Sequence, residues 1–281
     1  AVTPALQVWD AASRLLRTTV PLSLAAESVS VVDVTHALVA GPPFDGNGPQ
    51  PVAATQVVDL ETGVAGAVKV VGREPVAAAL VGGTALALTA DGVATFANVA
   101  TTGGGRVSTA DLSPMVDLVA GMTVVGYDPV GRHVAIGDES GAVVLGRLAG
   151  TGGAAGGAGG RVVDVHRVDT GGDPPSAVTF SADGHRVAVG GSLGSTRLFD
   201  TATGAIAGTP LTGLSSEVSD VAFSPDGSRL AVASVDGTGS VWSLDGTRSI
   251  GRPITRHRNA VVATVPLPDG ATLLTASFDG S

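Results

Sequence analysis

The stretch from Glu217 to Asp245, EVSDVAFSPDGSRLAVASVDGTGSVWSLD, constrains the fold more than any other part of the chain. It contains three short runs in which apolar residues alternate with small or polar ones, and the segments SPDGSR and VDGTG separate these runs. Alternation with a period of two, bounded by Asp-Gly turns, is typical of antiparallel strands joined by hairpins. The stretch therefore predicts three strands and two tight turns.

Copies of this unit recur along the chain. Residues 176–204 repeat it with Phe180 in the place of Phe223, a spacing of 43, and residues 261–281 repeat it again. Repeats of about 40–45 residues with four strands each are typical of propeller blades. The sequence therefore predicts an all-β fold, a β-propeller of four-stranded antiparallel blades, as a single domain over residues 1–281. Blades are expected to start near residues 28, 76, 122, 176, 218 and 261.

The two ends of the chain complement each other in this scheme. The last copy stops after its second strand, and residues 1–22 hold two strands with no first or second strand before them. Because a ring of sheets needs its first and last blades held together, we expect residues 1–22 to complete the last blade. This gives six blades, and the alternative is a seventh blade, either hidden within residues 100–125 or lost by truncation.

Several short motifs resemble those of one known family. They are FSPDG at 223–227, FSADG at 180–184, LPDG at 267–270, Trp9-Asp10, Phe199-Asp200 and VWSLD at 241–245. With these motifs the chain resembles the WD40-repeat β-propellers, and it looks like the bacterial WD40 arrays of actinobacterial type. Such arrays often lie behind an NTPase, kinase or regulatory domain.

The resemblance implies a set of His, Ser, Asp and Trp side chains that lock each blade through hydrogen bonds. In the unit that begins at residue 218, Ser234, Asp236 and Trp242 match this set, and Leu214 stands where the family has His. In the last blade His257, Ser277 and Asp279 match, and Trp9 would come from the N-terminus. A buried Asp needs donors, and Ser hydroxyl, His N–H and indole N–H supply them.

Composition bounds the partners and the location of the protein. The net charge of -9 argues against nucleic acid as a partner. The sequence contains no run of about 18 apolar residues, so it predicts no membrane insertion. Residues 1–20 show no signal-peptide pattern, and this favours a cytoplasmic location. The chain has no Cys, which excludes disulfides and thiol chemistry.

No pattern in the sequence indicates catalysis, a metal or a cofactor. The segment Gly190–Gly194 has the form G-x-S-x-G, but that motif needs a strand-to-helix turn. Here Ser192 aligns with Ser234 at the end of a strand, and no helix is expected after it. The five His residues are scattered without the paired spacing of a zinc site.

The sequence therefore predicts a non-enzymatic protein-interaction scaffold or sensor module, a monomeric domain within a larger bacterial regulatory or signalling protein. A protein partner is expected on the loop-rich faces, with the loops 41–51 and 149–160 as candidate contacts. Arg252, Arg256 and Arg258 form a basic cluster that would suit an acidic partner, and a solvated loop is the other interpretation. The alternative function is an extracytoplasmic TolB-like or lactonase-like propeller that binds a small ligand or metal.

Overall fold

The structure is a computed structural model. The described residues are 5–9, 16–23, 28–31, 36–41, 52–59, 61–62, 64–65, 69–73, 75–81, 84–89, 93–98, 107–112, 114–115, 122–128, 132–149, 160–245, 248–255, 257–266 and 273–277. They fall into two compact units, residues 1–116 with 150–161 and residues 117–149 with 162–281. In this described part, no helix has the length and apolar character needed to cross a membrane.

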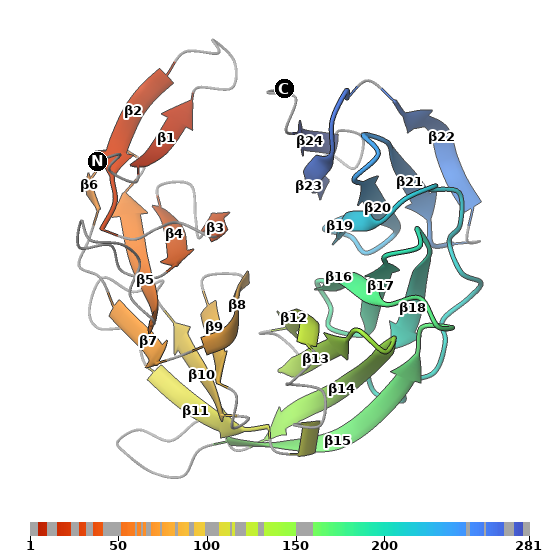
Figure 1. The fold of residues 1–281 in the computed structure, drawn as a ribbon, viewed down its shortest axis with the longest axis horizontal. Coiled ribbons are helices and arrows are strands. Elements are labelled where there is room, and N and C mark those ends of the chain that lie inside the picture. The colour runs from red at the N-terminus through yellow and green to blue at the C-terminus, as the bar shows by residue number, and fades with distance from the viewer. Residues whose placement is uncertain are drawn as a thin grey trace. The chain divides into compact units, whose positions relative to one another are not determined.

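The second unit consists of four antiparallel sheets in chain order (Figure 1). The first sheet is β12 (Met122–Asp128), β13 (His133–Asp138), β14 (Ala142–Ala149) and β15 (Gly160–Asp169). The second is β16 (Pro175–Phe180), β17 (Arg186–Gly191) and β18 (Thr196–Asp200). The third is β19 (Val218–Phe223), β20 (Arg229–Ser234), β21 (Gly239–Ser243) and β22 (Arg248–Ile254), and the fourth is β23 (Val261–Pro266) with β24 (Leu273–Ser277).

The first unit has the same kind of sheets. Its N-terminal pair is β1 (Ala5–Trp9) with β2 (Leu16–Pro21). The next sheet is β3 (Ser28–Val31), β4 (His36–Gly41) and β5 (Val52–Asp59), and its fourth position is divided between β6 (Val64–Ala65) and β7 (Lys69–Arg73), which both pair with β5. The last group of strands is β8 (Pro75–Val81), β9 (Thr84–Thr89), β10 (Val93–Asn98) and β11 (Val107–Asp111), and β15 pairs in parallel with β11 through Gly160 and Arg161.

The hairpin between β19 and β20 shows why the Ser-Pro-Asp-Gly sequence forms a turn. Asp226 accepts hydrogen bonds from the Ser224 hydroxyl (2.6 Å) and from the Ser228 backbone N–H (3.0 Å). These donors favour the carboxylate, so the Ser224 hydroxyl first and Ser228 next lower the pKa of Asp226 to about 2. Ser181 and Asp183 repeat the arrangement between β16 and β17, so the predicted hairpins at FSPDG and FSADG are confirmed.

The second sheet lacks a regular fourth strand. Two isolated bridges, Thr196 with Leu211 and Phe199 with Ile206, take its place along β18. Pro210 precedes Leu211 in this segment, and proline has no N–H to donate to a ladder. The edge of this sheet is therefore paired at only two points.

The cores of the second unit lie between neighbouring sheets. One cluster gathers buried residues of the second and third sheets, with Trp242 and Phe223 packed against it: Ala177, Ala188, Leu198, Leu211, Val218, Val221, Leu230 and Val232. A second cluster joins the first and second sheets around Phe199, which is fully buried. Small β-branched side chains suit this close packing of one sheet on the next.

The predicted fold class is confirmed, whereas the count and closure of the blades stay predictions. The first strands of successive sheets begin at residues 28, 75, 122, 175, 218 and 261. The single domain over 1–281 and the completion of the last blade by residues 1–22 also stay predictions. The interiors of the loops 41–51 and 149–160 lie outside the described residues.

Candidate binding rim

Hydroxyl groups link the first strands of the second unit, which lie side by side (Figure 1). The Thr123 hydroxyl on β12 donates to the Pro175 carbonyl (2.7 Å), and the Ser176 hydroxyl on β16 donates to the Val218 carbonyl (2.7 Å). The Ser219 hydroxyl on β19 donates in the same way to the Val261 carbonyl. Each hydroxyl stands second in its strand, so the same bond fixes three successive junctions between sheets.

The last of these junctions also contains a buried carboxylate. Asp220 on β19 accepts from the Thr264 backbone N–H (2.6 Å) and from the Thr264 hydroxyl (3.2 Å) on β23. Burial raises the pKa of Asp220, although the hydrogen bonds from Thr264 act in the opposite direction. This carboxylate therefore joins two neighbouring sheets.

Turns and loops interlock at one end of these sheets. In an antiparallel order, the turn between the second and third strands lies at the same end as the loop that enters the next first strand. We call this edge the rim, and it comprises the turns 139–141, 192–195 and 235–238 with the loops 170–174, 212–217 and 257–260.

One glycine in each turn permits the interlocking. Gly194 has a φ of +88°, which favours glycine, and a Cβ added there would lie 2.7 Å from the Leu214 carbonyl oxygen. Gly237 repeats this geometry against the His257 carbonyl, and Gly141 against the Thr170 hydroxyl. Each turn therefore packs on the loop that follows its own sheet.

A carboxylate from a loop completes the turn 192–195. Asp173, which is 6% exposed, accepts from the Leu193 backbone N–H (2.7 Å) and from both the backbone N–H (3.3 Å) and hydroxyl (2.5 Å) of Ser195. Gly191 makes room for it, because a Cβ at Gly191 would lie 2.1 Å from the carboxylate carbon. Asp173 therefore holds a turn that has no aspartate of its own.

The turn 235–238 achieves the same result with its own aspartate. Asp236 accepts from the Thr238 backbone N–H (2.9 Å) and from the Ser215 hydroxyl (2.7 Å) on the neighbouring loop. Partial burial acts to raise the pKa of Asp236, but the hydrogen bonds from Thr238, Ser215 and Ser234 outweigh it and the pKa is lowered. Asp236 is therefore ionised at neutral pH, and its carboxylate ties the turn to the loop.

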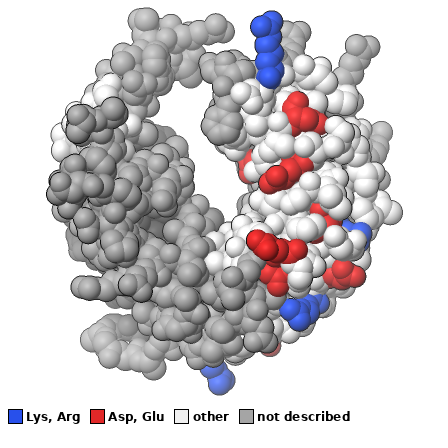
Figure 2. Space-filling view, viewed as in Figure 1, with Lys and Arg blue, Asp and Glu red and all other residues white. Residues whose placement is uncertain are grey.

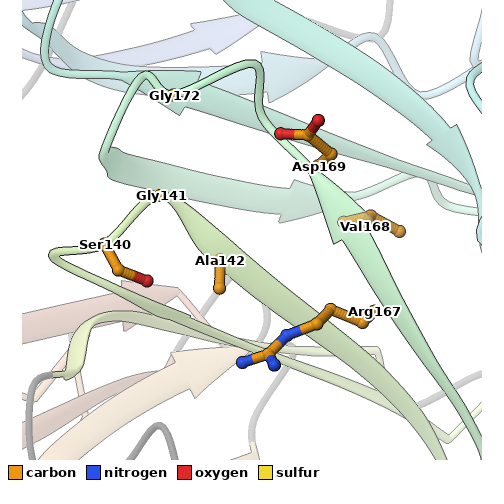
Figure 3. A pocket seen from close by; sticks show the side chains of 7 residues that line it. All are labelled: Ser140, Gly141, Ala142, Arg167, Val168, Asp169 and Gly172. Carbon is orange, nitrogen blue, oxygen red and sulfur yellow. The ribbon is translucent and has the colours of Figure 1, made fainter.

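A pocket of about 380 Å³ opens on the rim beside the turn 139–141 (Figure 3). Arg167 and Asp169 enter it from β15, and the Arg167 side chain extends toward Ala142 on β14. The remaining lining residues are Ser140, Gly141, Val168 and Gly172. A cation and a carboxylate in one exposed pocket suit polar contacts with a partner, without the buried setting of a catalytic site.

The rim carries more acidic than basic side chains among its described residues. Glu139, Asp169, Glu217 and Asp236 are exposed on it or at its border. Figure 2 shows acidic side chains spread over the described part of the second unit, with scattered basic ones. Charge of one sign on an exposed surface steers partners of the opposite sign.

The structure brings together part of the predicted blade-locking set. Ser234 and Asp236 lie two residues apart, and the Asp236 backbone N–H lies 3.4 Å from the Ser234 hydroxyl. The indole N–H of Trp242 donates to the Ser240 hydroxyl (2.8 Å), and its ring packs on the core between two sheets. Leu214, which occupies the place of the family's His, packs on the same core.

The second predicted set is only partly described. His257 contacts the Thr275 hydroxyl (2.8 Å), and the Ser277 hydroxyl donates to the Asn259 carbonyl (3.0 Å). Asp279 lies outside the described residues, and only the backbone of Trp9 is described, at the end of β1. The locking role of both sets stays a prediction.

The basic cluster is distributed differently from the predicted loop. Arg252 lies within β22, whose backbone alone is described there, Arg256 lies outside the described residues, and Arg258 is exposed on the rim. Its role as a docking patch stays a prediction.

The G-x-S-x-G segment is a strand-turn-strand unit, but the predicted alignment of Ser192 was wrong by one residue. β17 ends at Gly191, whose N–H donates to the Ser195 carbonyl as that of Ser234 donates to Thr238. Gly191 is thus the counterpart of Ser234, and Ser192 is the first residue of the turn. Within the described ranges, no group of three or more His, Cys, Asp or Glu side chains gathers as a metal site would require.

Successive antiparallel sheets with cores between them define a protein of the β-propeller class. A family model, the WD domain, G-beta repeat (WD40), matches residues 208–243. A chain of a solved structure titled "Crystal Structure of Mitotic Checkpoint Complex" covers 100% of this chain and 83% of its own length, with a TM-score of 0.68 and 16% sequence identity. No curated protein sequence matches the chain significantly.

The predicted resemblance to WD40-repeat propellers is therefore confirmed, by one repeat in the sequence and by the fold. Propellers of this family commonly serve as scaffolds for protein interaction and are generally not enzymes.

Sequence reasoning missed Asp173, Gly191 and the hydroxyl links between first strands. The links had a signal, because Ser176 and Ser219 have the same spacing as Phe180 and Phe223. Asp173 had none, since its partners lie about twenty residues further along the chain and only the packing of loop on turn brings them together.

Proposed function

We propose that this chain is a non-enzymatic protein-interaction module of a larger bacterial regulatory protein, with a protein partner held on the rim. The observation that supports this most is the rim itself. Its turns are fixed by Gly194, Gly237 and Asp173, so side chains on it are presented with little freedom. A surface that is ordered before binding loses less entropy when a partner docks.

The chemistry of the rim also supports binding over turnover. The Asp236 and Asp173 carboxylates are occupied by hydrogen bonds from the turns they hold. Carboxylates used in this way stabilise the fold and are poor candidates for general acid or base work, which needs a group within reach of a substrate proton.

Crosslinking in cells tests the proposal. A photoreactive amino acid replaces the exposed Glu217 on the rim, and the matched control replaces the exposed Ala202, in the turn after β18 at the opposite end of the sheets. Discrete protein adducts from position 217, absent from position 202, are expected. A purified chain that carries a stoichiometric divalent ion and turns over esters or lactones would instead support the small-ligand or metal-binding propeller.

A further inference from the structure

Two apolar side chains are exposed on neighbouring turns of the rim. Leu193 is 72% exposed in the turn 192–195, and Val235 is 38% exposed in the turn 235–238. An exposed leucine leaves apolar area in water, which a docked apolar group would cover favourably.

The fold does not require leucine at position 193. Gly191 is the counterpart of Ser234, so Leu193 is the counterpart of Asp236, whose carboxylate holds its own turn. In the turn of Leu193 the carboxylate of Asp173 performs that task from outside. The side chain at position 193 is therefore released from the turn's hydrogen bonds and projects into solvent.

One loop connects the two apolar side chains. The carbonyl groups of Leu214 and Ser216 pack on Gly194 next to Leu193. The same loop also contacts the turn of Val235. The Val235 backbone N–H donates to the Glu217 carbonyl (3.1 Å), and the Ser215 hydroxyl donates to the Asp236 carboxylate. Leu193 and Val235 thus lie on the two turns that contact the segment 214–217.

Carboxylates lie beside the apolar pair. Glu217 and Asp236 are both exposed, and hydrogen bonds keep Asp236 ionised at neutral pH. A bound segment that covers Leu193 and Val235 would place its own neighbouring side chains against these charges, and Lys or Arg would complement them.

We propose that the surface formed by Leu193, Val235, Glu217 and Asp236 binds an extended segment of a partner protein that carries an apolar side chain flanked by Lys or Arg. This inference rests on the proposed interaction function and names the chemistry of the partner. The apolar side chain covers Leu193 and Val235, and the basic side chains face the carboxylates.

Peptides of about ten residues test the surface directly. One series has a central Leu flanked by Lys, a second has the same Leu flanked by Glu, and a third has Ser in place of Leu between Lys residues. Binding to chain 1–281 is measured by fluorescence anisotropy at low and high salt. The Leu–Lys series is expected to bind about tenfold more tightly than either other series, and more weakly at high salt.

Variants of the protein localise the site. Leu193→Ser is expected to weaken the Leu–Lys peptide about tenfold, and Glu217→Gln to weaken it about threefold with a smaller salt dependence. The matched control Ile206→Ser removes another exposed apolar side chain, 54% exposed, near the opposite end of the sheets, and should leave the affinity unchanged. Equal affinity of Leu193→Ser and the unsubstituted chain, or equal affinity of all three peptide series, would overturn the inference.

The two proposals fail in distinguishable ways. If Leu193→Ser keeps the protein adducts that form from position 217 in cells, the interaction function stands and the apolar surface is wrong. If no adducts form and the purified chain turns over a small substrate, the proposed function itself is wrong.

Discussion

Removal of the Asp173 carboxylate should open the turn 192–195 without unfolding the sheet. Asp173→Ala deletes an acceptor of two backbone N–H groups and one hydroxyl. Each hydrogen bond to a charged group contributes about 1.5–3 kcal/mol. Because the turn is partly exposed, water replaces some of these bonds, and we expect a net local cost of about 3 kcal/mol. That cost corresponds to roughly 100-fold faster opening.

Amide hydrogen exchange read by mass spectrometry over residues 187–199 measures this opening. The control Asp169→Ala removes an exposed carboxylate at the border of the rim that accepts from the Gly171 backbone N–H, and it should leave exchange over residues 187–199 unchanged. The double variant Asp173→Ser with Leu193→Asp restores an aspartate within the turn, as at Asp236, and should recover most of the protection. Exchange in Asp173→Ala within about threefold of the unsubstituted chain would show that Asp173 does not hold the turn.

Three further predictions concern the links between sheets and the chain ends. Ser219→Ala removes the hydroxyl donated to the Val261 carbonyl and should cost about 1 kcal/mol; a melting temperature equal to that of the exposed control Ser249→Ala would contradict this. The lowered pKa of Asp226, about 2 against 3.8 ordinarily, means that its stabilising effect is present above pH 3.8 and is lost as the pH falls toward 2. The difference in melting temperature between the unsubstituted chain and Asp226→Asn should therefore shrink over that range, and a constant difference would exclude it. Deletion of residues 1–22 should cost a large share of the roughly 5–15 kcal/mol typical of a domain, if those residues complete the last blade; an unchanged melting temperature would show that they do not.

Local patterns in the sequence account for the strands and hairpins. The hairpin of Ser224 and Asp226 depends on residues within five positions of one another, so its motif can be recognised from the sequence alone. The sequence does not show which hydroxyl accepts the hydrogen bond from the Trp242 indole. Ser234 and Ser240 are both close to Trp242 in the sequence, and the pairing of β20 with β21 decides between them. The rim depends on contacts between each turn and the loops before and after its sheet, and a single sequence does not show which loop supplies the carboxylate.

If the interlocked rim is the binding surface, hydrogen exchange of chain 1–281 with and without the tightest-binding Leu–Lys peptide should show where the peptide lies. Protection is predicted in the segments 192–195, 214–217 and 235–238, with no change in the hairpins 181–185 and 224–228 at the opposite end of the sheets. Protection confined to those opposite hairpins, with unchanged exchange along the rim, would contradict the account.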